Sequence, residues 1–316
     1  MSSDHLSLGP GAEFDTIRAT LARWGAVARG TGDDAAVLEV PRGERLVVST
    51  DTAVENVHFR RAWLSAEEIA YRAGAAALSD LAAMGATPLA MTIALTLPET
   101  WRAESMALAD GIASVARETG TPIVGGDLTT GTELSLSVTA LGTVRRPLSR
   151  GGAREGQAVW VTGRLGAPRL ALEALERGLT PHPAHRARFA HPAPRLHEAR
   201  WLAEHGVTAA IDCSDGVAAD LGHVAAASRV RIVLDLDRLP CVSGATPDDA
   251  ARSGEEYELL VTAPEGLDAG AFEREFGLPL TAVGRVERAG AGGATVETLR
   301  GGVPVPAPRG HDHFTP

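Results

Sequence analysis

The sequence contains no lysine, and its 30 lysine-or-arginine positions are all arginine. A Walker A loop uses a lysine to hold the nucleotide phosphates, and protein kinases place a strand lysine there for the same purpose. Both classes of nucleotide-binding protein are therefore excluded. A chain of this composition that handles phosphate groups must use metal ions, arginine side chains and backbone amides instead.

Cysteine, aromatic side chains and long apolar runs are scarce as well. The two cysteines, Cys213 and Cys241, are too few for a disulfide framework. No apolar run reaches the length of a membrane span, and the N-terminal MSSDHLSLGP is not typical of a signal peptide. We therefore expect a soluble, cytoplasmic protein. The net charge of −10 argues against nucleic acids and anionic membranes as partners.

The length and the hydrophobic pattern predict two domains. A chain of 316 residues with 44% hydrophobic content is long for a single core. Apolar strands alternate with segments of helical period in both halves, which predicts an α/β or α+β fold. A stretch rich in glycine and arginine near Ser149 marks the boundary, giving domains 1–148 and 149–316. The proline- and histidine-rich stretch 181–194 is expected to be an irregular connection rather than a metal site.

Three apolar runs are predicted to be strands that lead into aspartates. LVVSTD ends at Asp51, PIVGGD ends at Asp127, and AAIDCSDG carries Asp212 and Asp215. Aspartate is a poor strand residue and a common turn or helix-cap residue, so each of these alone has an ordinary structural explanation. The same holds for Asp34 in the glycine-rich turn GTGDD.

Asp80 has no such ordinary explanation. It lies on the apolar face of a helix that a capping box at Ser65–Glu68 is predicted to open, and it is near the C-terminal end of that helix. The helix dipole disfavours an anion there, and burial disfavours any charge. Without lysine, the cation that such a carboxylate needs is arginine or a metal. The simplest common account is that several of the aspartates converge on Mg²⁺, which prefers hard oxygen ligands.

A series of motifs along the chain resembles a known family. They are GDDAAV at 32–37, STDTAVENVHF at 49–59, LSDLAAMGATP at 78–88, GGDLTTG at 125–131, LSRGGAREGQ at 148–157, DCSDG at 212–216 and SGEEYEL at 253–259. In this order they resemble the thiamine-monophosphate kinases, a branch of the aminoimidazole ribonucleotide synthetase superfamily. STDT with NVHF, LSDLAAMGA and the closing Asp-His-Phe are together specific to that branch.

The resemblance implies ATP-dependent transfer of a phosphoryl group to thiamine monophosphate, with Mg²⁺ as cofactor and ATP as co-substrate. It implies an N-terminal synthetase-like domain whose sheet pairs across a homodimer, and a C-terminal α/β domain. The positions that match magnesium ligands are Asp34, Ser49, Thr50, Asp51, Asp80, Asp127, Asp212 and Asp215. Those that match ATP contacts are Gly126, Asp127, Arg150 and Ser214, and those assigned to the substrate are His58, Glu255 and His311. No catalytic nucleophile or base is expected, because the acceptor phosphate is already ionised at neutral pH.

The chain departs from the family pattern at three places. The family usually has Gly-Glu-Asp where this chain has Gly254-Glu255-Glu256. His311 stands before the closing Asp-His-Phe, where an aromatic residue is usual, and Ala109 stands where an aromatic nucleotide contact is common. Stacking contacts to the substrates are therefore expected to be weaker or to come from elsewhere.

Two alternative functions fit part of the sequence. One is another ATP-dependent enzyme of the superfamily, although a selenophosphate synthetase would need a reactive cysteine and a lysine near the N-terminus, and a hydrogenase-maturation enzyme a C-terminal cysteine. The other is a non-catalytic magnesium- or nucleotide-binding module, which would leave His58 and Glu255 without a role. Cys213 is expected to be a small apolar strand-end residue and not a nucleophile.

Overall fold

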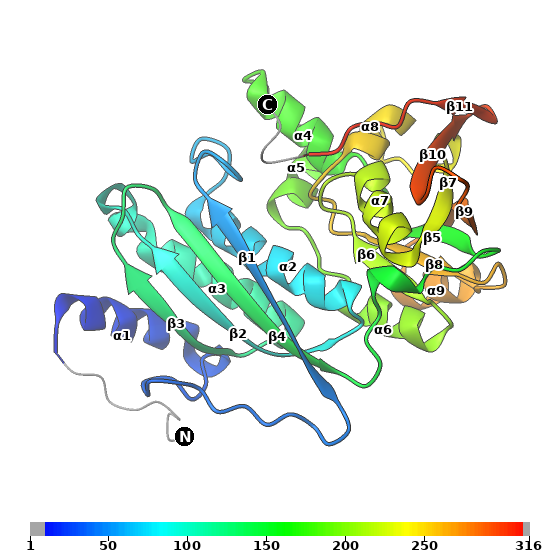
Figure 1. Cartoon of the computed structure of the whole chain (residues 1–316). Coiled ribbons are helices and arrows are strands. Elements are labelled where there is room, and N and C mark those ends of the chain that lie inside the picture. The colour runs from blue at the N-terminus through cyan, green and yellow to red at the C-terminus, as the bar shows by residue number, and fades with distance from the viewer. Residues whose placement is uncertain (1–9, 312–316) are drawn as a thin grey trace. The chain divides into compact units, whose positions relative to one another are not determined.

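The computed structural model describes residues 10–311, which form two units (Figure 1). Unit 1 comprises residues up to Leu81 together with Ala86–Arg146, and unit 2 comprises Ala82–Gly85 and the chain from Pro147 onward. Each unit has its own β-sheet with helices packed on it, which confirms the predicted two-domain α/β fold. The predicted Asp-His-Phe motif at 312–314 lies outside the described residues. No helix within 10–311 has both the length and the apolar character to cross a membrane.

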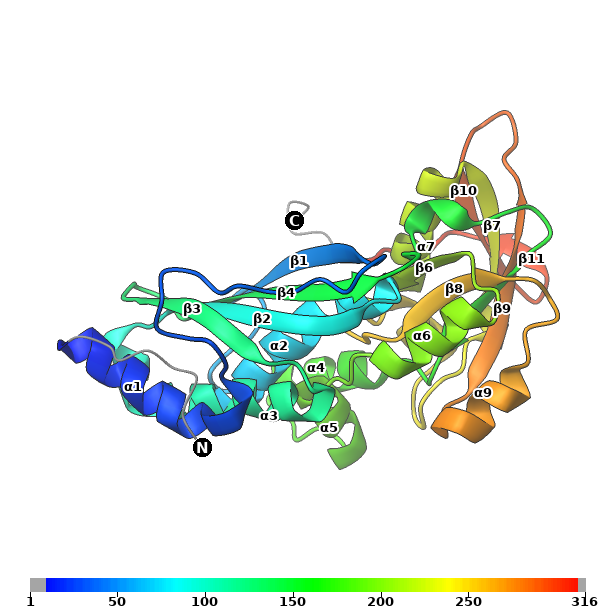
Figure 2. The ribbon, with the colours of Figure 1, turned by 90° about the horizontal axis from the view of Figure 1, so that it is seen from below.

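Unit 1 is a four-stranded sheet in the order β1-β4-β2-β3. β4 is antiparallel to both of its neighbours, and β2 and β3 are parallel. Helices α2 and α3 lie on one face of the sheet, and α1 packs on α3 (Figure 2). The elements are α1 (Ala12–Trp24), η1 (Gly25–Val27), β1 (Arg45–Val54), α2 (Ala66–Ala83), β2 (Thr87–Thr96), η2 (Glu99–Glu104), α3 (Ser105–Thr119), β3 (Ile123–Thr129) and β4 (Ser135–Val144).

Helix α2 begins at the predicted capping box. The backbone N–H of Ser65 donates to Glu68 Oε2 at 2.8 Å, and the backbone N–H of Glu68 donates to Ser65 Oγ at 3.2 Å. Small residues then allow α2 to approach α3 closely. A Cβ on Gly111 of α3 would lie 2.0 Å from the Glu67 carbonyl oxygen, so only glycine fits there.

Unit 2 is a seven-stranded mixed sheet in the order β11-β10-β7-β9-β5-β8-β6. Apolar residues of α7, among them Val217 and Leu221, form one core with Ile232 and Val283 of the sheet. The opposite face is covered by α6 and α9, where Trp201 packs edge-on against Phe272 (Figure 2). The elements are η3 (Arg150–Gly152), β5 (Ala158–Thr162), α4 (Ala167–Glu176), α5 (Pro183–Ala190), α6 (Leu196–Glu204), β6 (Ala209–Asp212), α7 (Val217–Ser228), β7 (Val230–Asp235), η4 (Leu236–Arg238), α8 (Pro247–Arg252), β8 (Leu259–Ala263), α9 (Ala269–Phe276), β9 (Leu280–Arg288), β10 (Thr295–Arg300) and β11 (Val303–Val305).

Two strands continue past the aspartates at which the sequence predicted them to end. β1 runs on from Asp51 to Val54, and β3 runs on from Asp127 to Thr129. The prediction is therefore wrong for these two and right for Asp212, the last residue of β6. The ladder with β4 pairs β1 along its whole length, and these backbone hydrogen bonds outweigh the low strand propensity of aspartate.

The stretch 181–194 was expected to be irregular, and that prediction is wrong. It contains α5 (Pro183–Ala190), which begins with a proline in its first turn and with the side chain of His182 accepting the backbone N–H of Ala184 at 3.3 Å. Proline suits the first turn of a helix because the N–H it lacks would have no helical partner there. The helix carries Arg188 toward buried carboxylates described below.

Candidate functional site

In unit 1, strand β1 carries candidate ligands on the face that it turns toward α2. Ser49 and Asp51 are two residues apart and half-buried, whereas Thr50 between them is exposed, as the alternation of a strand requires. The Ser49 hydroxyl donates to Asp80 Oδ2. Within residues 10–311, the partner of this helix carboxylate is thus a hydroxyl and not an arginine. The hydroxyl of Thr50 instead lies 2.9 Å from that of Thr139 on the other face.

Strand β3, at the other edge of the same sheet, carries Gly126 and Asp127. A Cβ at position 126 would lie 2.1 Å from the Ile93 carbonyl oxygen, so only glycine fits. Asp127 is exposed and pairs in register with Ala94 of β2. β4 and β2 separate β1 from β3, so Asp51 and Asp127 stand on strands roughly 14 Å apart at the usual strand spacing. The sheet of one chain does not bring these two carboxylates together.

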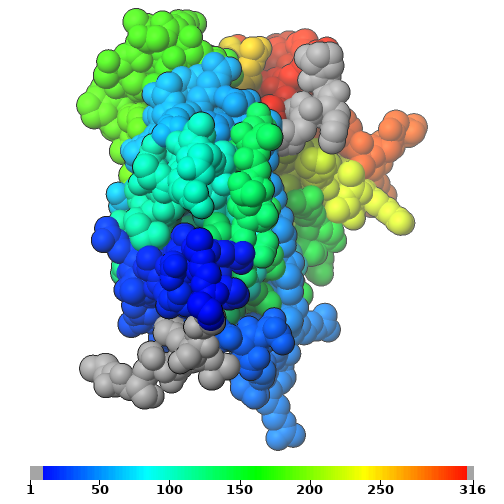
Figure 3. Space-filling view, turned by 90° about the vertical axis from the view of Figure 1, so that its left-hand side faces the viewer, coloured from blue at the N-terminus to red at the C-terminus, as the bar shows by residue number. Residues whose placement is uncertain are grey.

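Asp34 lies in the exposed segment between α1 and β1. Its backbone N–H donates to Asp33 Oδ1 at 2.9 Å. The segment, drawn in mid-blue, stands out from the surface of unit 1 (Figure 3). Its carboxylate is accessible to a ligand but is not fixed by the sheet.

His58 is held in the turn that follows β1. Its backbone N–H donates to the Val54 carbonyl oxygen at 2.9 Å, and its ring Nδ1 accepts the Val54 N–H at 3.1 Å. Because a backbone N–H is always a donor, Nδ1 must be the unprotonated nitrogen and the neutral ring carries its proton on Nε2. The ring is therefore oriented to donate a hydrogen bond from Nε2.

Position 109 in unit 1 is not open to a ligand. Ala109 is buried on α3, and its carbonyl oxygen accepts the Trp24 indole N–H at 2.9 Å. An aromatic residue there would enter a packed interior, which accounts for alanine at this position.

In unit 2, two loops carry the candidate residues and are joined by backbone hydrogen bonds. The first loop, 213–216, links β6 to α7, and the second, 253–258, leads into β8. The N–H groups of Glu255, Tyr257 and Cys213 donate to the carbonyl oxygens of Ser214, Cys213 and Glu258 at 2.7, 3.0 and 2.7 Å. The structure thus brings Asp212, Ser214, Asp215 and Glu255 into one place.

The second loop has an unusual backbone. Glu255 and Tyr257 adopt left-handed conformations with φ of 56° and 53°. Such conformations cost about 1 kcal/mol or more for residues other than glycine. A Cβ on Gly254 would lie 2.6 Å from the Ser214 carbonyl oxygen, so the two loops also fit closely against each other. The rest of the unit must supply the free energy that keeps this loop in place.

Below the second loop lies a set of charged residues, the buried Glu–Arg cluster: Arg188, Arg195, Glu256 and Glu258. The fully buried Glu258 accepts from Arg195 at 2.8 and 2.5 Å, from Arg188 at 2.9 Å and from the Thr162 hydroxyl at 2.7 Å. Glu256 accepts the Gly166 N–H at 2.5 Å and Arg188 at 3.3 Å.

The two glutamates of this cluster differ in their pKa. Burial opposes ionisation of Glu258, but Arg195 and Arg188 outweigh it and lower its pKa. Burial raises the pKa of Glu256 to about 7 despite Arg188. Glu258 is therefore the firmly ionised member of the cluster.

Asp220, which no sequence motif singled out, lies in α7 and supports the first loop. It is buried in the first turns of α7 and accepts the backbone N–H groups of Asp215 at 3.2 Å and Gly216 at 3.1 Å. Burial, and then the charges of Asp215 and Asp212, raise its pKa to about 7. An acid near a helix N-terminus is common, so its sequence position alone gave no signal.

The thiol of Cys213 is not a nucleophile here. It is fully buried, and burial followed by the charge of Asp220 raises its pKa well above the usual range. Such a thiol stays protonated and unreactive at neutral pH.

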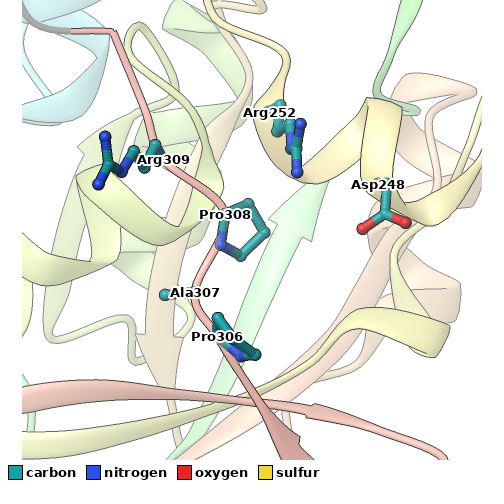
Figure 4. Close-up of a pocket in the computed structure, with 6 residues that line it drawn as sticks. All are labelled: Asp248, Arg252, Pro306, Ala307, Pro308 and Arg309. Atoms are coloured by element: carbon teal, nitrogen blue, oxygen red, sulfur yellow. The ribbon is translucent and has the colours of Figure 1, made fainter.

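The C-terminal tail and α8 flank a pocket of about 300 Å³ (Figure 4). The tail continues to His311, whose N–H donates to the Asp215 carbonyl oxygen at 2.9 Å. Asp248 is paired with Arg300 at 2.7 and 3.0 Å. Because Arg252 and Arg309 also line the pocket, its charge favours anions. The pocket is lined by Asp248, Arg252, Pro306, Ala307, Pro308 and Arg309.

Arg150 stands in η3 with an exposed side chain and a fixed backbone. Its carbonyl oxygen accepts the Ser228 hydroxyl at 2.7 Å, and a Cβ on the nearby Gly152 would lie 1.7 Å from the Thr208 carbonyl oxygen. Within the described chain, no three histidine, cysteine, aspartate or glutamate side chains are grouped closely enough to hold a metal ion. Asp212 and Asp215 are in unit 2, and the other predicted magnesium ligands are in unit 1.

Comparison with known proteins identifies the family to which the chain belongs. The family models described as AIR synthase related protein, N-terminal domain and C-terminal domain match residues 32–144 and 154–297. The thiamine-monophosphate kinase of Escherichia coli K12 is 35% identical, over 95% of this chain and 95% of its own length. That of Rhodopirellula baltica is 38% identical over 82% of this chain and 84% of its own. The chain belongs to the thiamine-monophosphate kinase family.

Solved structures of the family share the fold. The thiamine-monophosphate kinase from Stenotrophomonas maltophilia K279a has a TM-score of 0.80 at 36% identity and covers 95% of this chain and 99% of its own. AaThiL complexed with AMPPCP and TMP has a TM-score of 0.75 at 30% identity, with 95% and 96% covered. The hydrogenase maturation protein HypE in complex with ATP reaches 0.78 at 21% identity, which shows a common fold only.

Proposed function

We propose that the chain transfers the γ-phosphoryl group of ATP to thiamine monophosphate, giving thiamine diphosphate and ADP. The observation that carries this proposal is the family membership over nearly the whole chain, together with a relative that binds AMPPCP and TMP. We also propose residues 1–148 and 149–316 as the limits of the two domains. The alternatives are another ATP-dependent enzyme of the superfamily and a non-catalytic magnesium- or nucleotide-binding module.

The proposed magnesium ligands are the oxygen side chains named from the sequence in both units. Their chemistry fits the ion, since carboxylate and hydroxyl oxygens are hard ligands. Burial, and then the charges of Asp215 and Asp212, raise the pKa of Asp220, and the repulsion among these carboxylates favours a cation nearby. Mg²⁺ bound there would neutralise the charge of the phosphate groups. Gly126, Asp127, Arg150 and Ser214 are the proposed ATP contacts, and His58, Glu255 and His311 the proposed substrate contacts.

Transfer is proposed to be a single in-line step. A phosphomonoester has its second pKa at about 6, so the acceptor oxygen is ionised and needs no base. His58, with its proton on Nε2, is suited to donate to the substrate phosphate. Catalysis then consists of positioning and charge neutralisation. A γ-phosphate made chiral with oxygen isotopes should invert its configuration, and retention would demand a covalent intermediate.

The active form is proposed to be a homodimer joined through the sheets of unit 1. The face of this sheet away from the helices exposes Leu46 and Val48, at 48% and 55% of their full area. Its two edge strands, β1 and β3, carry Asp51 and Asp127, and within one chain these strands lie roughly 14 Å apart. Pairing with a second copy covers such a face and such edges. Val48→Asp should convert the dimer to monomer in light scattering, and a wild type that is monomeric at micromolar concentration would contradict the proposal.

One assay tests the proposed activity. Purified protein is incubated with ATP, Mg²⁺ and a panel of phosphomonoesters, and the diphosphate products are measured. We expect product from thiamine monophosphate alone. Turnover of ATP with another acceptor would identify a different enzyme of the superfamily, and nucleotide binding with no turnover would identify a binding module.

A further inference from the structure

We propose that the buried Glu–Arg cluster positions the loop 253–258, so that Glu255 is held ready for the substrate. This rests on the proposed function for the role of Glu255, but the positioning itself does not. Arg188 and Arg195, which carry no assigned role in the family resemblance, are thereby positioning residues.

Burying the charges of the Glu–Arg cluster costs free energy. Glu256 and Glu258 are buried at 1% and 0% exposure, and Arg195 at 9%. Replacing buried ion pairs by apolar residues is often neutral or stabilising, so overall stability alone does not explain such a cluster. Its hydrogen bonds are directional, however, and apolar residues cannot replace them in fixing one loop conformation.

The cluster is attached to the strained part of the loop. The loop has two residues in the left-handed conformation, Glu255 and Tyr257. Glu256 lies between them, and Glu258 follows Tyr257. A strained backbone relaxes unless its surroundings hold it. The side chains of Glu256 and Glu258 are fixed by donors from other segments of unit 2, and the backbone between them is therefore fixed as well.

The surrounding chain fits closely around the side chain of Glu258. A Cβ on Gly163 would lie 2.3 Å from Glu258 Oε1, so the chain leaves room for this carboxylate by using glycine. The Thr162 hydroxyl donates to Glu258 and accepts the Leu259 N–H at 2.8 Å. Glu255 is half-exposed, whereas Glu256 and Glu258 of the same loop are buried.

Arg188 is the residue to change, because its side chain is 28% exposed. When Arg188 is replaced, Glu258 still has Arg195 as its partner. Arg188→Ala should leave the protein folded. Arg188→Lys keeps a positive charge near both glutamates and should behave almost as the wild type. Arg288→Ala is the matched control, since Arg288 forms an exposed ion pair with Glu155 at 3.1 Å in the same unit.

Hydrogen–deuterium exchange measures positioning without reference to activity. The N–H groups of Glu255 and Tyr257 are hydrogen-bonded in the native loop. In Arg188→Ala, exchange of the peptide covering 253–258 should accelerate on the order of tenfold, with the peptides of α7 unchanged. Exchange as slow as in the Arg288→Ala control would overturn the proposal.

Steady-state kinetics then connect the loop with the substrate. In Arg188→Ala, the KM for thiamine monophosphate should rise about tenfold while the KM for ATP changes less than about twofold. Arg188→Lys should restore both. A lower melting temperature with an unchanged KM for thiamine monophosphate would show that the cluster has only a structural role. Absence of product from the wild type would instead refute the proposed function, and the exchange experiment would still decide the positioning.

Discussion

In unit 1 the candidate residues stand on regular elements, whereas in unit 2 they stand on two irregular loops. Ser49 and Asp51 take their orientation from the alternation of β1, and Asp80 from the last turns of α2. Ser214 and Glu255 instead lie in loops that backbone hydrogen bonds join, next to the buried Glu–Arg cluster. Unit 1 therefore needs no special support for its carboxylates, and unit 2 carries extensive support.

The difference predicts two kinds of mutational effect: loss of a charge in unit 1 and loss of backbone support in unit 2. Replacing a carboxylate on β1 removes charge but leaves the backbone of the sheet intact. Replacing a residue under the loop 253–258 removes support from a backbone that is strained at Glu255 and Tyr257. Variants in unit 1 should thus lose activity at constant stability, and variants in the cluster should lose both.

Asp51→Asn is expected to have the largest effect. It should lower kcat by about 100- to 1,000-fold, because a neutral amide is a much poorer ligand for a cation that neutralises phosphate charge. The melting temperature should change by no more than a few degrees. Asp110→Asn, on α3 and paired with Arg23 at the surface, is the control with the same chemical change. A near-normal rate in Asp51→Asn would remove Asp51 from the proposed site.

Glu256→Gln should alter the pH dependence of stability. Burial raises the pKa of Glu256 to about 7, so the folded state holds this proton more tightly than the unfolded state. The stabilisation is fully present below about pH 4.5 and is lost as the pH rises through 7. Between pH 5 and pH 8 the wild type should therefore lose roughly 2 kcal/mol more unfolding free energy than the variant. Urea titrations at the two values measure this, and parallel losses would contradict the raised pKa.

His58→Asn should act on the substrate rather than on the chemical step. The KM for thiamine monophosphate should rise about tenfold, with kcat falling much less than in Asp51→Asn. In the proposed mechanism the phosphate acceptor needs no base, and the role proposed for the imidazole is to hold the substrate. A kcat loss as large as that of Asp51→Asn, with an unchanged KM, would instead assign His58 to proton transfer.

Asp80→Asn should give the smallest effect, which is a change in how much bound ligand raises the melting temperature. Mg²⁺ with nucleotide should raise the melting temperature of the wild type, since a ligand at 100 times its Kd adds about 2.7 kcal/mol. In Asp80→Asn this shift should fall by about half, because the Ser49 hydroxyl then has an uncharged partner and the ion one carboxylate fewer. Asp110→Asn should keep the full shift. Equal shifts in all three proteins would place Asp80 outside the site.

The sequence by itself determined the kind of protein. The alternation of apolar strands and helical segments predicted two α/β domains, the capping box at Ser65 predicted the start of α2, and the order of the motifs identified the family. These features are local, because they depend on the period of the side chains along the chain and on hydrogen bonds between residues close in sequence.

Only the tertiary structure decided where the side chains lie and what holds them. It continued β1 and β3 past their aspartates, since pairing with a neighbouring strand outweighs local propensity. It formed a helix in the stretch 181–194 and brought Arg188 and Arg195 to Glu258, more than sixty residues along the chain. Contacts between residues so far apart in sequence arise from packing, and no local pattern in the sequence of either segment predicts them.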